Sequence, residues 1–316
     1  KLYINGWEDR SKLAPRFELT PGATISPASG TLRDFTKPQT YVVTSQDGQW
    51  KKTYTVSFEV NDVPTKYHFE GLDYYIFKDN DTGEEHKKFE KIYEKLPDGS
   101  KTEWNSGNAG FMITNGTAGL KDYPTMQDDN GYIGKCVKLV TRSTGPMGIA
   151  FGAPIAAGNL FLGEFQIDIL NMAKSTRFGL PYRNTPVAIS GYYKYQPGAK
   201  FTDKTNTVLE NARDTFDIYA VMYESTTETP FLDGTNIKTH PSIVMIAQLK
   251  ERKPTDAWTH FSMTYEPVAG RTLDPEKLRK GQYNLAIVMS SSQGGAFFRG
   301  AVGSTLWVDE LQLFHE

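Results

Sequence analysis

The chain has 316 residues, enough for two domains with separate hydrophobic cores, and its 35 basic and 37 acidic residues leave a formal charge of −2. This near balance excludes the basic excess that nucleic-acid binding requires. No apolar run approaches the roughly 20 residues that span a bilayer, so no transmembrane segment is expected. Aromatic residues make up 13% of the chain, a content that is common where flat rings bind ligands or fill a sandwich.

Residues 1–62 read as short strands separated by turns. Alternating patterns at 40–44 and 52–60 flank Asp47 and Gly48, a pair that favours a β-hairpin. No helical period is visible in this segment. We therefore expect a small all-β module, followed by a polar, proline-containing linker and a second domain over 66–316.

Three stretches of this module carry a resemblance to a known family: LTPGATISPASG at 19–30, RDF at 33–35 and TYTV at 53–56. Together they resemble the immunoglobulin-like modules at the N-termini of surface proteins from Gram-negative gut anaerobes that scavenge glycans. The resemblance implies that residues 1–62 form a spacer. A binding role for Trp50 is the alternative.

The second domain opens with residues 66–70, and the most charged stretch of the chain, residues 78–103, follows. Residues 79–83 partly match a calcium loop but lack its third oxygen ligand and its glycine at position six, so a solvated turn is expected. The spacing of Phe89, Ile92, Tyr93 and Leu96 fits either a short amphipathic helix or a pair of strands.

From Trp104 onward, strands and glycine-rich loops continue to the end of the chain. Cys136, the single cysteine, excludes an internal disulfide and is expected to be a buried strand residue. The pattern at 272–278 predicts one helical turn. Strand patterns occupy 134–140, 163–169, 188–195, 216–223, 242–248, 259–265, 283–289 and the closing stretch before 313. So many strands without a long helix predict an all-β chain whose larger part is an antiparallel jelly-roll sandwich.

Catalytic motifs are scarce in this framework. No nucleophile elbow, zinc-protease motif or phosphate loop occurs, and the five histidines show no ligand spacing. A glycosidase needs two carboxyl groups about 5 Å or roughly 6.5–9.5 Å apart, which makes strand carboxylates the candidates. These are Glu164, Asp168, Asp217 and Glu224, with an exposed structural role as the alternative for each.

Aromatic placement suggests a binding site instead. Alternation along 191–198 sends Tyr193 and Tyr195 to one face of a strand and Tyr192 and Lys194 to the other. A groove of rings with amide and guanidinium groups suits a carbohydrate, whereas core packing is the alternative for any single ring. The predicted sugar-binding residues are Trp104, Asn108, Tyr182, Arg183, Tyr193 and Tyr195. Alanine at Tyr193 or Trp104 is then expected to weaken glycan retention and leave the thermal midpoint nearly unchanged.

Five segments in order carry a second resemblance: WNSGNAG at 104–110, LFLGEF at 160–165, RFGLPY at 177–182, GYYKYQPG at 191–198 and GAVGSTLWVDE at 300–310. They resemble the putative carbohydrate metabolism domain family over about residues 66–316. The resemblance implies a β-sandwich from a polysaccharide-utilisation system, often labelled a glycoside hydrolase, without an established catalytic pair.

The two ends of this domain also resemble the framing strands of carbohydrate-binding modules. In those modules acidic residues hold a structural calcium between the first and last strands, which here implies Glu70 and Asp309. Strand-end hydrogen bonding is the alternative. No cofactor is required beyond this optional calcium.

The sequence thus predicts a glycan-binding protein at the outer membrane surface or in the periplasm. For such a protein we expect a lipid anchor upstream of Lys1. We also expect it to contact other glycan-utilisation proteins. A glycoside hydrolase and a purely structural or adhesive surface subunit are the alternative functions.

Overall fold

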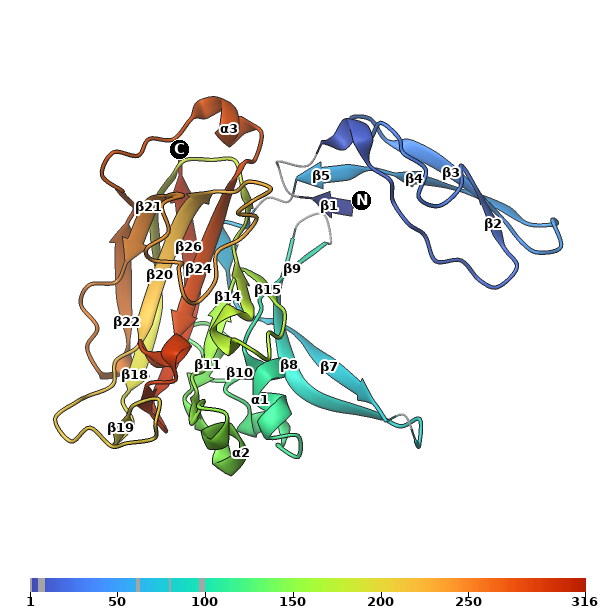
Figure 1. Cartoon of the computed structure of the whole chain (residues 1–316). Coiled ribbons are helices and arrows are strands. Elements are labelled where there is room, and N and C mark those ends of the chain that lie inside the picture. Colours follow the sequence, from blue (N-terminus) through green and yellow to red (C-terminus); the bar gives the residue numbers. More distant parts are fainter. Residues whose placement is uncertain (1, 5–8, 61–62, 80, 97–99) are drawn as a thin grey trace.

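The structure is a computed structural model that describes residues 2–4, 9–60, 63–79, 81–96 and 100–316 (Figure 1). Strands dominate throughout, and the helices are short. None of the helices in these ranges is long and apolar enough to cross a membrane. The predicted all-β class is confirmed.

The N-terminal part contains two small sheets. Strands β2 (Thr24–Ser26), β3 (Gln39–Thr44) and β4 (Lys51–Val56) form an antiparallel sheet, and β1 (Leu2–Ile4) pairs in parallel with β5 (Phe58–Val60). A single 3₁₀ turn, η1 (Arg10–Lys12), lies between β1 and β2.

The core of this small module is aromatic. Phe35 and Tyr41 are buried, with Phe17 and Phe58 packed on them at ring-centroid distances of 4.7 and 4.8 Å. Asp47 and Gly48 form the predicted hairpin turn between β3 and β4. The predicted limit of this module at residue 62 lies outside the described residues and stays a prediction.

A three-stranded hairpin sheet follows, with β7 (Gly71–Lys78), β8 (Glu85–Lys95) and β9 (Lys101–Glu103) in that order. It projects from the body of the second domain in Figure 1. Of the two alternatives for residues 89–96, the strand is the one that forms. Ile92 is buried in the core of the sandwich, whereas Phe89 is buried in a separate cluster with Phe111 and Tyr123.

Two six-stranded sheets make up the sandwich of the second domain. We name each sheet after a central strand. The β18 sheet contains β10 (Thr125–Asp128), β11 (Cys136–Val140), β26 (Thr305–His315), β18 (Pro186–Gln196) and β22 (Thr255–Thr264), with β6 (Lys66–Tyr67) paired to β26. The β20 sheet contains β14 (Asn159–Phe161), β24 (Tyr283–Ser290), β20 (Asp217–Glu224), β21 (Ile243–Gln248) and β23 (Glu266–Pro267), with β17 (Leu180–Tyr182) paired to β24.

The remaining elements are short and lie in the connections. Three strand pairs are β12 (Arg142–Ser143) with β13 (Ile155–Ala156), β15 (Gly163–Phe165) with β16 (Thr176–Phe178), and β19 (Phe201–Thr202) with β25 (Gly300–Ala301). The helices and 3₁₀ turns are α1 (Asn108–Thr114), α2 (Gly145–Ala150), α3 (Pro275–Arg279), η2 (Leu120–Asp122), η3 (Met172–Lys174) and η4 (Gly295–Phe297). Helix α3 is the helical turn predicted at 272–278, and the Asp274 carboxylate caps it by accepting from the N–H groups of Glu276 and Lys277.

The core lies between the β18 and β20 sheets, which pack as a jelly-roll sandwich. Strand β20 shows how alternation separates its two faces: Ile218, Ala220 and Met222 join the core, whereas Tyr219 and Val221 belong to a second cluster on the outer face. The closing strand β26 pairs with both β11 and β18, which makes it central to its sheet.

Cys136 lies at the start of β11 and is fully buried, as expected. Burial raises the pKa of its thiol to about 12, so the sulfur stays protonated and unreactive at neutral pH.

Candidate functional site

Four of the predicted sugar-binding rings lie in the sandwich core. Trp104, Tyr182, Tyr193 and Tyr195 are 1–4% exposed and belong to the cluster between the sheets. Trp104 packs on Tyr67 with a centroid distance of 4.9 Å. A saccharide cannot reach these rings in this fold, which corrects the prediction that they line a groove. The predicted alternation along β18 is present. The face with Tyr193 and Tyr195, predicted to bind sugar, is the one that faces the core.

Asn108 and Arg183 are also partly or fully buried. Asn108 is fully buried and joins α1 to β10, because its amide oxygen accepts from the N–H of Thr125 at 3.0 Å and its amide nitrogen donates to the carbonyl of Thr125 at 2.7 Å. Arg183 follows β17 and is half-buried. Asn108 therefore supports the fold.

Glu70 and Asp309 bind the same loop, residues 131–135. Oε1 of Glu70 accepts from the N–H of Lys135 at 2.8 Å, and Oδ2 of Asp309 accepts from the N–H of Ile133 at 2.9 Å. Gly134 has a φ of +64°, which favours glycine, and a Cβ atom there would displace the Glu70 carboxylate from the loop. The described residues contain no cluster of three or more His, Cys, Asp or Glu side chains that could hold a metal. Calcium at this pair stays a prediction.

The four candidate carboxylates lie in different surroundings. Glu164 is exposed on β15, and Asp168 caps a loop by accepting from the N–H groups of Leu170 and Asn171. Glu224 forms an ion pair with Lys277 at the far end of β20 from Asp217. Because Asp217 and Glu224 are also seven residues apart along β20, alternation places them on opposite faces of the β20 sheet.

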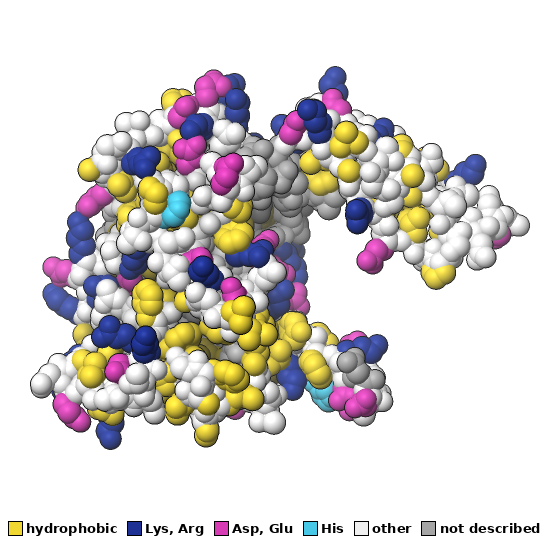
Figure 2. Space-filling model, in the orientation of Figure 1, with side chains coloured by type: hydrophobic (Ala, Val, Ile, Leu, Met, Phe, Trp, Pro, Cys, Tyr) yellow, Lys and Arg dark blue, Asp and Glu magenta, His cyan; other side chains and the backbone are white. Residues whose placement is uncertain are grey.

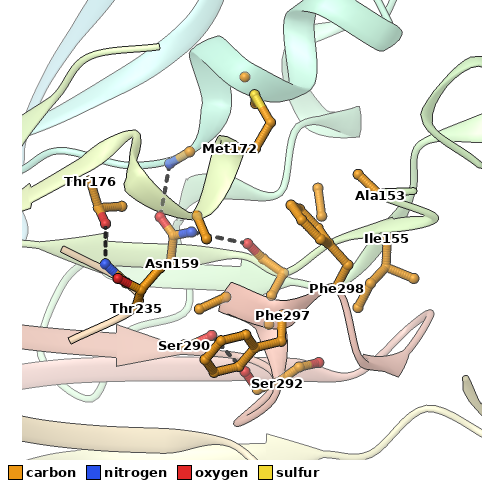
Figure 3. A pocket seen from close by; sticks show the side chains of 18 of the residues that line it. Ala153, Ile155, Asn159, Met172, Thr176, Thr235, Ser290, Ser292, Phe297 and Phe298 are labelled. Carbon is orange, nitrogen blue, oxygen red and sulfur yellow. Dashed lines mark hydrogen bonds between the residues drawn. The ribbon is translucent and has the colours of Figure 1, made fainter. Parts of the chain in front are cut away.

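A cavity opens on the outer face of the β20 sheet. It has a volume of about 530 Å³, within the range of small-molecule sites. Strands β14, β20 and β24 form its floor, and α1, α2, η4 and the loops at 165–173 and 234–239 form its walls. Figure 3 shows Phe298 beside Ile155 and Phe297 next to Ser290, with Met172 on the opposite side.

Rings and aliphatic groups dominate the lining. The aromatic members are Phe111, Phe151, Phe161, Phe165, Phe178, Tyr219, Phe297 and Phe298. Three of the apolar lining residues are largely exposed at the rim: Phe151 at 73%, Ile169 at 79% and Phe297 at 55%. Figure 2 shows hydrophobic side chains gathered in the lower part of the view, over the region of α1 and α2. Exposed apolar groups around a hollow are typical of a ligand or partner site.

Most polar groups in the lining already bond within the protein. The Asn159 side chain accepts from the N–H of Gly107 at 2.8 Å, and the Thr176 hydroxyl accepts from the N–H of Gly234 at 3.0 Å (Figure 3). The Gln293 amide and the Thr239 hydroxyl form no side-chain hydrogen bond with another described residue. These two groups are available to a ligand.

Asp217 is the one carboxylate among the described lining residues, and cations surround it. Lys238 forms a short ion pair with one oxygen, while Arg252 Nη1 lies 3.1 Å and Gln248 Nε2 3.3 Å from the other. The carboxylate is 3% exposed, and Lys238 also lies 4.2 Å above the Tyr219 ring. Both oxygens of the carboxylate are therefore engaged by side chains of the protein itself.

The cavity can therefore bind an apolar or ring-shaped ligand face, but it lacks the two carboxyl groups of a glycosidase within its described lining. Sequence reasoning missed its principal residues, Phe297 and Phe298. Their signal was two adjacent rings inside an otherwise polar, glycine-rich loop, where no core requires them.

Comparison with known proteins places the chain in a carbohydrate-related class. Residues 68–314 match the family described as putative carbohydrate metabolism domain, and residues 1–57 match the one described as SGBP, N-terminal. The chain belongs to the putative carbohydrate metabolism domain family, as the sequence motifs indicated. A search of curated proteins finds no match.

Two solved structures are similar over most of the chain. A putative glycoside hydrolase from Bacteroides thetaiotaomicron is 46% identical, with a TM-score of 0.78, over 99% of this chain and 89% of that one. A second putative glycoside hydrolase, from Bacteroides vulgatus, is 37% identical with a TM-score of 0.71, over 81% of this chain and 99% of that one.

The core position of Trp104 leads to a stability prediction. Replacing this 2%-exposed ring with alanine leaves a large cavity, and we expect the free energy of unfolding to fall by about 3–5 kcal/mol. Urea unfolding measures this loss. Trp50→Ala is the matched control, because Trp50 is 77% exposed and its loss should change stability by less than about 0.5 kcal/mol. Equal, small effects of the two changes would place Trp104 outside the core.

The buried Asp309 leads to a pH prediction. Burial raises the pKa of its carboxyl to about 6, above the ordinary 3.8. Between about pH 4 and 6 the folded state then holds a proton that the unfolded state has lost, so this group's contribution to stability falls as the pH rises, by up to about 3 kcal/mol. Asp309→Asn lacks this dependence.

Unfolding free energies of the wild type and Asp309→Asn at pH 4 and pH 7 measure the effect. We expect the variant to gain relative to the wild type at pH 7, and a constant difference would contradict the raised pKa. The same two proteins test the calcium prediction, since calcium at this pair would raise the thermal midpoint of the wild type more than that of the variant.

Proposed function

We propose that this protein binds saccharides without cleaving them and that the cavity on the β20 sheet holds the sugar. The observation that carries the proposal is a cavity of about 530 Å³ with aromatic walls whose described carboxylate is already neutralised by Lys238 and Arg252. Membership in a carbohydrate-related family supports a saccharide over other ring-shaped ligands.

Each part of the cavity has a role in this proposal. The rings of Phe151, Phe297 and Phe298 would pack on the apolar C–H faces of a pyranose. Gln293 and Thr239 would bond to its hydroxyl groups, since neither side chain is engaged with another described residue. The ion-paired Asp217 and Lys238 would complete the polar part of the floor.

We further propose that the protein acts at the cell surface or in the periplasm, within a glycan-utilisation system. The match of residues 1–57 to a family described as SGBP, N-terminal, supports the surface location and a spacer role for these residues. A lipid anchor upstream of Lys1 and contacts with other proteins of the system are further expectations of this proposal.

Phe297 gives the sharpest test of the cavity. We expect Phe297→Ala to weaken oligosaccharide binding about tenfold, equivalent to roughly 1.4 kcal/mol, because it removes one exposed ring of the wall. Isothermal titration with oligosaccharides identified on a glycan array measures the change. Phe314→Ala is the matched control, since Phe314 is a 41%-exposed ring on β26 outside the cavity. Unchanged affinity in Phe297→Ala would overturn the placement of the site.

Hydrolysis is the second candidate function, because both similar structures are described as putative glycoside hydrolases. Asp217→Asn separates the two functions. We expect neither the wild type nor the variant to release reducing sugar. The variant should unfold with a free energy about 2–3 kcal/mol lower than that of the wild type, because Lys238 and Arg252 lose their anionic partner. Sugar release that the variant abolishes would establish catalysis. A chain that neither binds nor cleaves glycans would instead be a structural or adhesive subunit.

A further inference from the structure

The outer face of the β18 sheet carries a group of aromatic rings around one lysine, on the opposite side of the sandwich from the cavity. Alternation directs Tyr192 and Lys194 outward from β18 and Trp307 outward from β26, because Tyr193, Tyr195, Leu306 and Val308 lie in the core. On β22, Phe261 and Met263 lie in the core, so the same alternation places Trp258 on the outer face. Tyr132 joins them from the 131–135 loop. We call these five residues the tryptophan–lysine strip.

Lys194 lies between the two indoles. Its Nζ atom is 4.6 Å from the centre of the Trp258 ring and 5.3 Å from that of Trp307. Because both rings lie next to this one nitrogen, their centres are at most about 10 Å apart. Such a separation is expected for side chains on strands that are two positions apart in a sheet. On the far side of Trp307, Lys138 Nζ lies 5.3 Å from the same ring.

Tyr132 extends the strip along β18. Its ring stacks on Tyr192 at a centroid distance of 3.7 Å and meets Trp258 nearly edge-on at 6.4 Å. Tyr132 is 44% exposed, so the ring face that Tyr192 does not cover is open. The hydrogen bond from the Ile133 N–H to Asp309 holds the loop in this position.

The charge on Lys194 has no described carboxylate partner. Its neighbours on this face do: Lys138 Nζ is 3.4 Å from Asp128, and His68 is 2.8 Å from Glu310. The Lys194 ammonium contacts two ring faces instead, which leaves hydrogen atoms that can donate to an oxygen acceptor. A half-buried ammonium between two indoles fits a ligand that presents both apolar faces and oxygens.

We propose that the strip is a second carbohydrate-binding surface that takes an extended glycan chain. Pyranose rings would pack on Trp258 and the open face of Tyr132, with a hydroxyl or carboxylate oxygen bound to Lys194, which Trp307 helps to position. An open sheet face suits the interior of a chain, whereas the cavity encloses a short ligand. The inference rests on the carbohydrate class of the proposed function but uses none of the cavity residues.

Affinity electrophoresis of the full chain tests the strip. The gels contain either arabinogalactan, a largely neutral polymer, or polygalacturonate, a uronic-acid polymer. Comparing the two shows whether Lys194 binds a hydroxyl or a carboxylate oxygen. We expect Trp258→Ala to raise the dissociation constant at least tenfold for a polymer that retains the wild type, and Tyr132→Ala to raise it severalfold. Lys194→Met should weaken polygalacturonate retention most if a carboxylate binds there.

Two controls keep fold and site effects apart. Trp50→Ala removes an equally large, exposed indole from the N-terminal part and should leave retention unchanged. Thermal midpoints show whether each variant folds, and Tyr132→Ala carries the test if Trp258→Ala does not, because Tyr132 is an exposed loop residue.

Retention lost in the strip variants but kept in Phe297→Ala supports the strip and shows that it holds a polymer without help from the cavity. Retention lost in Phe297→Ala and kept in every strip variant overturns the strip and leaves the proposed function intact. Wild-type protein that no polymer retains, or strip variants that change only the oligomeric state measured by light scattering, would also overturn the inference.

Discussion

Burial of one face of each long strand between two sheets is the constraint on which the other features of the second domain depend. Tyr193 and Tyr195 of β18 pack around Phe216 at 4.8 Å, and this inward placement forces Tyr192 and Lys194 outward. The same rule on β20 directs Ile218 inward and Asp217 into the cavity. Both candidate binding surfaces are thus made of residues that the core excludes.

The cavity owes its chemical character to polar groups that are satisfied within the protein. Three polar side chains of the lining already bond to backbone or charged groups of the protein: Asn159, Thr176 and Asp217. The surface left for a ligand therefore consists mainly of aromatic rings. The Asp217 carboxylate is ion-paired with Lys238 and Arg252, so its oxygens are already engaged within the protein. Such a floor can help to orient a ligand, but the described lining holds no second carboxyl group to complete a glycosidase pair.

Much of the fold could be predicted from the sequence, because alternation along strands is a local signal. The strands around β11, β18 and β24, the helical turn at Asp274 and the buried Cys136 all follow from short patterns. The site could not be predicted in the same way. Alternation separates Tyr192 from Tyr193 but does not say which of them meets the other sheet. Phe151 and Phe297 line the same cavity although they are about 150 residues apart in the sequence. Only tertiary packing decides both.

The outer faces of the β18 and β20 sheets point in opposite directions, so the two candidate binding surfaces lie on opposite sides of the sandwich. A cavity on one side and an open strip on the other would let one molecule engage two chains, or two parts of a chain that passes around its edge. Once one surface is occupied, the second binding event is intramolecular, and its strength depends on the effective concentration of the next segment rather than on the bulk glycan. Two weak surfaces arranged in this way give avidity that neither would supply alone.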